Sequence, residues 1–432
     1  MSKRRGYRAT EVNHVRWESL VAGRVAGAVT VGMDIGKFEI LVVVRWADST
    51  FERPWRVENP AGIPQLIGLL RKLREEQALT VALESTGTYG DALRSQLAAA
   101  DLPVRRVGGK AAHDYAEVFD GVPSQHDGKD AAILAELGAF GKATDWPYVT
   151  ASDTERDLAY WVDWLDAQQQ VQMMWTNRLE PLLARHWPEL TRLVPLNSVM
   201  LLRMLAHYGG PAAVAADATA TEQLARWSRC SARAPRIGRV VASAASTLGV
   251  PQARRDIERV RQDATLALAA AREVTRARRQ LAVVAQEIGP LQQQGAVVGI
   301  ATACVLWTCL GSPENYRCAA AYRKAMGLNL KERSSGRHQG QLKITRRGPA
   351  LVRRWLYFAA MRLAQRAGVR AWYQAKKTKD KDRGKGALIA VARKLALALY
   401  YVGARGEVFA ACRLFPGTPT LGPPARTAAV PE

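Results

Sequence analysis

The sequence lacks the cysteine pairs that build metal or disulfide motifs. Its five cysteines are odd in number and none forms a Cys-x-x-Cys pair, which argues against a zinc ribbon and a disulfide framework. No uninterrupted apolar stretch reaches the roughly 20 residues needed to cross a bilayer. The N-terminal residues lack the apolar segment of a signal peptide. We therefore expect a reduced, cytoplasmic protein with no membrane partner.

Acidic residues are also in short supply. The 432 residues include 62 Lys and Arg but only 39 Asp and Glu, a net charge of +23. Such an excess predicts a polyanionic partner, usually nucleic acid, although ribosome association or a membrane surface fits the same charge. Because 48% of the residues are hydrophobic, the chain can fill real cores and is not a disordered basic protein. Its length predicts two or three domains.

The segment from residue 29 to about 150 is predicted to be an α/β unit. Apolar runs rich in Val and Ile, joined by tight turns, favour an antiparallel meander of three strands. Helical spacing then alternates with strands, and the resulting order, βββαβαβα, is that of the ribonuclease H-like (RuvC-like) fold. The predicted strands are residues 30–35, 38–46, 50–57, 79–83 and 104–107, and the predicted helices are residues 63–73, 89–99 and 130–140.

The remainder of the chain is predicted to be mainly helical. Two long segments, residues 153–183 and 253–285, favour an antiparallel coiled coil, within the chain or between protomers. The many arginines of 253–279 are either a solvated face or a nucleic-acid contact. The expected divisions are a flexible basic extension (1–28), the RuvC-like domain (29–150), a helical coiled-coil or linker region (151–288), a mainly α C-terminal domain (289–415) and a disordered tail (416–432).

Four carboxylates are the candidate catalytic and metal-binding residues of the first domain. Asp34 ends the first predicted strand and Glu84 ends the fourth, and these strands are neighbours in a ribonuclease H-like sheet. Asp127 and Asp130 lie three residues apart at the start of a helix, and therefore on one helix face. Carboxylates that converge in this way repel each other unless cations lie between them. Oxygen ligands favour Mg²⁺ or Mn²⁺, and two such ions can support phosphoryl transfer.

Each of these residues also has a purely structural interpretation. Asp127-Gly128 is a common turn sequence, Asp130 can serve as a helix N-cap, and Glu84 can be a solvated strand end. The segment Gly32–Lys37 also suits the phosphate-binding hairpin of an actin-like kinase. Such a kinase needs a second α/β half, and the sequence after residue 152 has no strands to supply one.

A second candidate site lies in a basic, glycine-containing segment near residue 335. A serine hydroxyl in so positive a field would have its alkoxide stabilised, with a phosphate held beside it. A basic patch that only holds the DNA backbone is the alternative. The candidate nucleophile is Ser335, with Ser334 as the fallback, and the candidate nucleic-acid-binding residues are Arg333, Arg337, Lys343, Arg346, Arg347, Arg353 and Arg354.

The two candidate sites together resemble the DEDD transposases of bacterial insertion sequences, the IS110 family. The resemblance rests on residues 31–37, on Leu83-Glu84-Ser85-Thr86-Gly87-x-Tyr89, on Lys129-Asp130-Ala131, and on Ser334-Ser335-Gly336 followed by Arg346-Arg347-Gly348. The sequence departs from the family pattern at Ala301, where a second glycine is usual, and at His126, where a threonine is typical.

This resemblance implies a mechanism and partners. It implies a RuvC-like domain that holds Mg²⁺ with Asp34, Glu84, Asp127 and Asp130, and a serine, Ser335, that links covalently to DNA phosphate. It also implies donor and target DNA as substrates, a bridge RNA as guide, a dimer or tetramer with active sites shared between protomers, and a place on the bacterial nucleoid. The alternatives are a RuvC-like structure-specific nuclease or resolvase and a non-catalytic nucleic-acid-binding protein.

Overall fold

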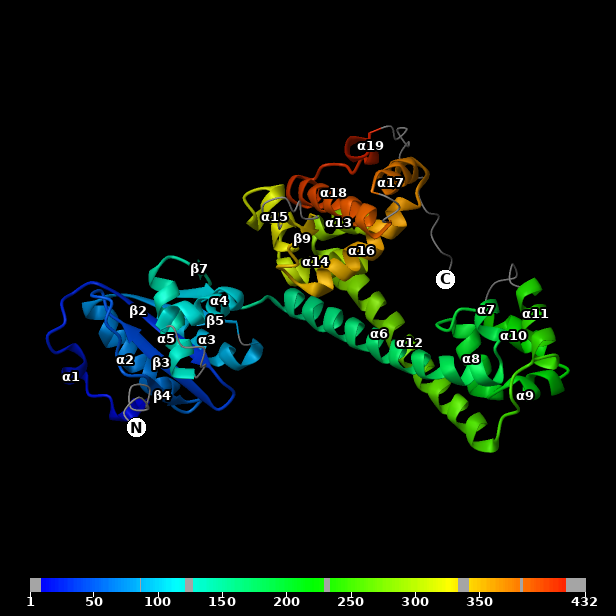
Figure 1. Cartoon of the computed structure of the whole chain (residues 1–432), viewed down its shortest axis with the longest axis horizontal. Coiled ribbons are helices and arrows are strands. Elements are labelled where there is room, and N and C mark those ends of the chain that lie inside the picture. The colour runs from blue at the N-terminus through cyan, green and yellow to red at the C-terminus, as the bar shows by residue number, and fades with distance from the viewer. Residues whose placement is uncertain are drawn as a thin grey trace. The chain divides into compact units, whose positions relative to one another are not determined.

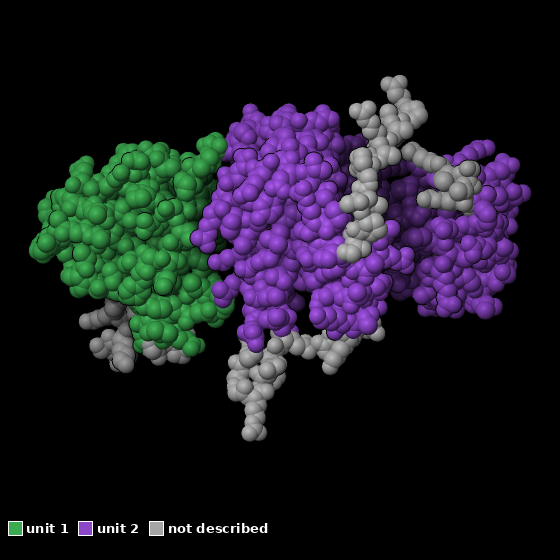
Figure 2. All heavy atoms as spheres, turned by 90° about the horizontal axis from the view of Figure 1, so that it is seen from above, with its two compact units in different colours: residues 1–150 green, residues 151–432 purple. Residues whose placement is uncertain are grey.

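The computed structural model describes residues 9–85, 87–120, 127–228, 234–332, 342–380 and 384–416. The chain divides into two compact units, Met1–Thr150 and Ala151–Glu432 (Figures 1 and 2). The finer five-part division expected from the sequence remains a prediction.

A seven-stranded mixed sheet forms the centre of the first unit. Its strands are β1 (Thr10–Glu11), β2 (Ala28–Ile35), β3 (Glu39–Arg45), β4 (Trp55–Glu58), β5 (Ala78–Glu84), β6 (Val104–Val107) and β7 (Thr144–Asp145), in the spatial order β1-β4-β3-β2-β5-β6-β7. β2, β3 and β4 form the predicted antiparallel meander. β5 pairs in parallel with β2 on one side and with β6 on the other. This strand order confirms the ribonuclease H-like fold.

Helices cover both faces of this sheet (Figure 1). They are α2 (Ile63–Glu76), α3 (Asp91–Ala99), α4 (Gly109–Asp120) and α5 (Asp127–Ala139). Because successive strand residues point to opposite faces, β2 contributes to the packing on both sides of the sheet. Val31 and Met33 pack with α2 and α3, whereas Gly32, which lies between them, faces α5. α4 was not predicted, and only one of its residues, Ala116, is buried.

Residues 9–28, the described part of the extension predicted over residues 1–28, contain regular secondary structure. From Ala9 onward the chain is folded against the sheet: β1 pairs in parallel with β4, and a short helix, α1 (Trp17–Val21), follows a turn of 3₁₀ helix. Val12 and Leu20 from this segment are buried in the core of the first unit. The partly buried Val15 and Trp17 pack against the same core.

Gly32 allows α5 to lie directly on β2. A Cβ atom at this position would come within 2.0 Å of the Ala131 carbonyl oxygen and 2.4 Å of the Ala135 amide nitrogen. Farther along the helix, a Cβ at Gly138 would come within 2.9 Å of Thr30 and 2.8 Å of Ala82. α5 therefore runs antiparallel to β2, and its first turn lies over the end of that strand.

Replacing Gly32 with alanine should destabilise the first unit. The added methyl group meets helix backbone rather than a flexible side chain, so α5 must move, at a cost of about 1–3 kcal/mol in the free energy of unfolding. Gly68→Ala in α2 is the matched control: open space surrounds that position, and alanine should stabilise the exposed helix by about 0.5–1 kcal/mol. Urea denaturation of the two variants measures both effects. Equal stability of Gly32→Ala and the wild type would contradict this packing.

Two long antiparallel helices form the backbone of the second unit. α6 (Asp153–His186) begins with a capping box at Ser152, and α12 (Arg254–Val284) packs along it. The Trp164 indole donates a hydrogen bond to Glu273, and Arg178 pairs with Asp263. Since residue numbers rise along one helix and fall along the other, the predicted antiparallel pairing forms within one chain.

The segment between these helices is helical, as predicted for the remainder of the chain. It contains α7 (Leu190–Leu193), α8 (Val199–Tyr208), α9 (Pro211–Ala216), α10 (Ala220–Ser228) and α11 (Ala234–Ala245). Gly209, with a φ of +76°, ends α8, and Pro211 begins α9. These residues mark helix ends. The short helices form a separate core with the neighbouring halves of α6 and α12.

A helical bundle with a two-stranded hairpin occupies the rest of the second unit. Its elements are α13 (Gly289–Val298), α14 (Ile300–Leu310), α15 (Ala319–Ala325), β8 (Leu330–Lys331), β9 (Lys343–Ile344), α16 (Ala350–Ala364), α17 (Ala367–Lys379), α18 (Gly384–Arg405) and α19 (Ala411–Leu414). The apolar run 296–309 is divided between α13 and α14 at Gly299, whose φ is +89°. Lys376, Lys377 and Lys379 belong to the last turn of α17.

One described helix, α18, is long and apolar enough to cross a membrane. Its apolar window has a mean hydropathy of 1.5, and 56% of that window is buried inside the fold. Val391, Leu395 and Leu399 from this helix belong to the core of the bundle. α18 thus packs as a core helix, and its length and composition alone are weak evidence for a membrane span.

Candidate active site

The sheet places two of the four predicted carboxylates side by side. Asp34 and Glu84 directly follow Met33 and Leu83, the last residues at which β2 and β5 pair with each other. Both lie two residues after positions that face α5, Gly32 and Ala82, and therefore share that face. The strand order and the two-residue period thus bring them together at one edge of the sheet.

α5 supplies the other two carboxylates. Asp127 and Asp130 both lie in its first turn, which the close packing at Gly32 holds over the end of β2. One carboxylate oxygen from each of Asp34, Asp127 and Asp130 lies within 4.8 Å of the others. The structure therefore brings all four predicted residues to one edge of the sheet, with three of them at a spacing that suits a shared metal ion.

The electrostatics of this cluster oppose full ionisation in the absence of a cation. Burial, followed by the charges of Asp130, Asp127 and Glu84, raises the pKa of Asp34 to about 6. Burial and the charge of Asp130 also raise the pKa of Glu84. Carboxylates held together in this way are expected where a cation completes the site. The donor set consists only of carboxylate oxygens and fits Mg²⁺ or Mn²⁺.

This cluster is positioned by three residues for which the sequence predicted no structural role. Lys129 is fully buried, and its ammonium pairs with Asp120 at 2.6 Å, which ties α5 to α4. Gly109 leaves room for the Glu84 carboxylate, since a Cβ there would come 2.1 Å from Oε1. The Asn59 side chain donates to the Gly36 carbonyl at 3.0 Å, beside the end of β2. Nothing in the sequence marks these contacts, because each joins segments that are brought together only by folding.

The raised pKa of Asp34 predicts a pH-dependent stability of the metal-free protein. Between about pH 4 and 6 the folded state binds more protons at Asp34 than the unfolded chain, whose pKa is the ordinary 3.8. The free energy of unfolding should therefore fall as the pH rises through this window. Asp34→Asn removes this contribution and should flatten the dependence, although Glu84 acts in the same direction.

Chemical denaturation at pH 4.5 and 7 in metal-depleted buffer measures this difference. The wild type should lose more stability than Asp34→Asn between the two pH values, and added Mg²⁺ should restore wild-type stability at pH 7. Identical pH profiles for the two proteins would show that Asp34 has an ordinary pKa.

Part of the second predicted site falls outside the described residues, since residues 333–341, which include Arg333, Ser334, Ser335 and Arg337, are not described. The described residues on either side of it form a two-stranded hairpin in the second unit, in which β8 pairs with β9 and Lys331 lies opposite Lys343.

Two glycines, which have no side chain, allow the base of this hairpin to pack closely against α15. A Cβ at Gly348 would come 2.2 Å from the Ala325 carbonyl oxygen, and one at Gly327 would come 3.0 Å from the backbone of the turn. Arg346, in the turn, has a φ of +57°, and its amide donates to the Gly327 carbonyl at 3.0 Å. This packing fixes where the hairpin leaves the bundle.

A basic cavity of about 1230 Å³ adjoins the hairpin. Two of the predicted nucleic-acid-binding residues, Lys343 and Arg346, line it. Arg393 of α18 lines it as well, and burial and the neighbouring Arg323 lower its pKa. The cavity contains further cations that the sequence did not assign to this site: Lys331, Lys376, Lys379 and Lys385. Three of these lysines lie within residues 376–385, a basic stretch that is visible in the sequence. Only the fold shows that they line this cavity.

Three other arginines predicted to bind nucleic acid differ in their surroundings. Arg347 is exposed. Arg353 donates hydrogen bonds to the carbonyl oxygens of Gly348 and Pro349, and Arg354 pairs with Asp166 of α6. Arg353 and Arg354 therefore have structural contacts, and their role in nucleic-acid binding remains a prediction.

Comparison with protein families gives two matches. A DEDD transposase model described as "Transposase" matches residues 31–188, a range that includes all four carboxylates. A model described as "Transposase IS116/IS110/IS902 family" matches residues 294–376, a range that includes the hairpin. The two domains define a DNA-processing enzyme, a transposase. The chain belongs to the IS110 family of DEDD transposases. Comparison with curated proteins gives no match.

Proposed function

We propose that the protein is a metal-dependent DNA recombinase that transposes an insertion sequence by cleaving and exchanging DNA strands. The observation that carries this proposal is the cluster of Asp34, Asp127 and Asp130, with oxygens within 4.8 Å of one another. Glu84 lies on the adjacent strand. Such a cluster has little structural value in a ribonuclease H-like sheet, because its mutual repulsion disfavours the ionised folded state.

Asp34, Glu84, Asp127 and Asp130 would hold Mg²⁺ or Mn²⁺ in this proposal. The bound ion would neutralise charge on a DNA phosphate during phosphoryl transfer. The protein's own contribution is placement: β2 and β5 fix two ligands on the sheet, and α5 carries the others on a rigid helix turn. Ligands on regular elements keep a metal geometry more closely than ligands on loops.

The proposed nucleophile is the hydroxyl of Ser335, with Ser334 as the fallback. Its oxygen forms a bond to the DNA phosphorus, the bond from phosphorus to one sugar oxygen breaks, and that oxygen gains a proton while the serine loses one. Because one phosphate ester replaces another, the reverse step with a different strand reseals DNA without external energy. Lys343 and Arg346, beside the ends of this segment, support the proposal by supplying positive charge for the DNA backbone.

A guide RNA and a homo-oligomer are further parts of the proposal, and the family resemblance supports them. A bridge RNA would choose donor and target DNA by base pairing, which leaves the protein to bind backbone and perform chemistry. In a dimer or tetramer, the acidic cluster of one protomer would act with the serine of another. Light scattering of the protein with and without RNA transcribed from its flanking DNA tests both parts.

A two-plasmid recombination assay tests the proposed function. One plasmid carries the element's ends and flanking DNA, and the other carries its target. Glu84→Gln should abolish joined products, and Glu75→Gln, which changes an exposed carboxylate on α2, should leave them unchanged. If wild-type protein gives only free DNA ends and no joined product, the nuclease alternative is correct instead.

A further inference from the structure

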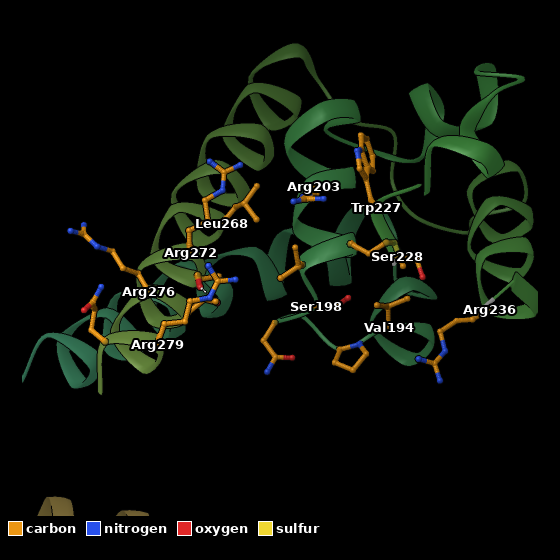
Figure 3. Close-up of a pocket in the computed structure, with 17 residues that line it drawn as sticks. Val194, Ser198, Arg203, Trp227, Ser228, Arg236, Leu268, Arg272, Arg276 and Arg279 are labelled. Atoms are coloured by element: carbon orange, nitrogen blue, oxygen red, sulfur yellow. Dashed lines mark hydrogen bonds between the residues drawn. The ribbon is translucent and has the colours of Figure 1, made fainter. Parts of the chain in front are cut away.

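A second cavity, of about 780 Å³, lies in the second unit between α12 and the short helices α8 and α11 (Figure 3). It is lined entirely by residues 194–280, which neither family match covers. Figure 3 shows Arg272 and Arg279 on one helix, with Arg203 and Trp227 on the elements across from it. The same cavity is lined by Arg236 of α11. With Arg276, also of α12, five arginines from three helices line this cavity.

The positive charge of this cavity is not balanced within the described residues. None of its described lining residues is a carboxylate. Within the described ranges, no acidic side chain lies at ion-pair distance from Arg203, Arg236, Arg272 or Arg279, whereas Arg276 at the same cavity pairs with Glu273. Arginines that repel one another without a partner raise the free energy of the folded state. They are therefore expected to meet an anion supplied from outside, and guanidinium groups match phosphate geometry.

The cavity also has an apolar part. Trp227, Met200 and Leu268 line it together with the arginines. The Trp227 ring is only partly buried and is held at its edges by His207 and Tyr208. A ligand that suits this lining needs an anionic part and a flat apolar part. A nucleotide has both, and its base is available only where it is not paired within a duplex.

We propose that this arginine cavity binds an unpaired segment of nucleic acid. Arg203, Arg236, Arg272 and Arg279 would hold the phosphates, and Trp227 would contact a base. The volume lies within the roughly 300–1,000 Å³ typical of ligand pockets, so a short stretch of strand fits rather than a whole duplex. The site shares no residue with the acidic cluster or with the basic hairpin cavity. It therefore gives the middle helices, whose arginines had two open interpretations, a nucleic-acid-binding role.

The test measures binding of the full-length protein to fluorescein-labelled 12-mers by anisotropy, in EDTA so that the acidic cluster does not contribute. The probes are single-stranded uridine RNA, single-stranded thymidine DNA and a DNA duplex. The cavity variant is Arg272→Glu with Arg279→Glu. The matched control is Arg259→Glu with Arg278→Glu, which makes the same charge change at exposed positions of the same helix outside the cavity. Circular dichroism and thermal melting verify that both variants fold.

The cavity variant should bind at least one single-stranded probe roughly 10- to 100-fold more weakly, while the control loses about threefold or less. The logarithmic salt dependence of wild-type binding should also fall by about two counterions in the cavity variant. The single-stranded probe with the greater loss, RNA or DNA, identifies the source of the strand. Equal losses in the two variants, a greater loss for the duplex than for either single strand, or no loss at all would overturn the proposal. If the cavity variant does not fold, Arg272→Gln with Arg279→Gln replaces it under the same criteria.

Discussion

Asp34→Ala is expected to lower the rate of DNA strand cleavage by on the order of 10³-fold, because it removes one of the proposed metal ligands from the acidic cluster. The carboxylate oxygens of Asp34, Asp127 and Asp130 lie within 4.8 Å of one another, and Asp34 is the member of this group that the sheet rather than α5 supplies. The same substitution should not destabilise the metal-free fold at neutral pH. Burial and neighbouring charges raise the pKa of Asp34, so its ionised form costs stability there.

A loss of DNA cleavage without a loss of folding stability distinguishes a functional residue from a structural one. Cleavage is measured on labelled DNA in a gel assay with Mg²⁺, and stability is measured by thermal melting in metal-depleted buffer. Glu75→Ala, on the exposed side of α2, is the control for removing a carboxylate and should change neither quantity. If Asp34→Ala cleaves DNA at the wild-type rate, the cluster is not the catalytic centre.

Ser335→Ala is expected to eliminate the covalent protein–DNA adduct while leaving DNA binding within about twofold of the wild type. The substitution removes the oxygen that would attack phosphorus but leaves the cations of the hairpin cavity, which in our proposal supply the contacts to the DNA backbone. The loss should be complete, since alanine has no nucleophilic atom.

A denaturing gel with end-labelled DNA measures this adduct, because a covalent bond alone survives denaturation. Ser334→Ala is the matched control, one residue away in the same segment, and should retain the adduct. If Ser335→Ala retains the adduct and Ser334→Ala loses it, the nucleophile is Ser334. Persistence of the adduct in the double variant would exclude both serines.

Much of the acidic site could be predicted from sequence, because it depends on two local rules. The ends of neighbouring parallel strands meet at one edge of a sheet, which places Glu84 beside Asp34. Residues three apart share a helix face, which places Asp130 beside Asp127. The helix itself begins at Asp127, three residues earlier than the apolar pattern indicated. Its first turn carries Asp127, Lys129 and Asp130 and no large apolar side chain that would extend the pattern.

The contacts that hold the acidic site together could not be predicted, because they join segments distant in sequence. A buried lysine such as Lys129 has the same sequence signature as an exposed one, and only the fold places it against Asp120. Gly32 looks like an ordinary strand glycine until α5 is seen to pack on it. The positive charge of the second unit was evident from composition. Its separation into a cavity beside the hairpin and another between α8 and α12 required the tertiary structure.

The most direct test of the metal-centre account is anomalous diffraction from crystals of the protein soaked in Mn²⁺. The account predicts an anomalous peak bounded by Asp34, Glu84, Asp127 and Asp130, at roughly 2.0–2.2 Å from carboxylate oxygens, and its absence in crystals of Asp34→Ala. A protein that cleaves DNA in the same Mn²⁺ buffer but shows no peak at this cluster would contradict it.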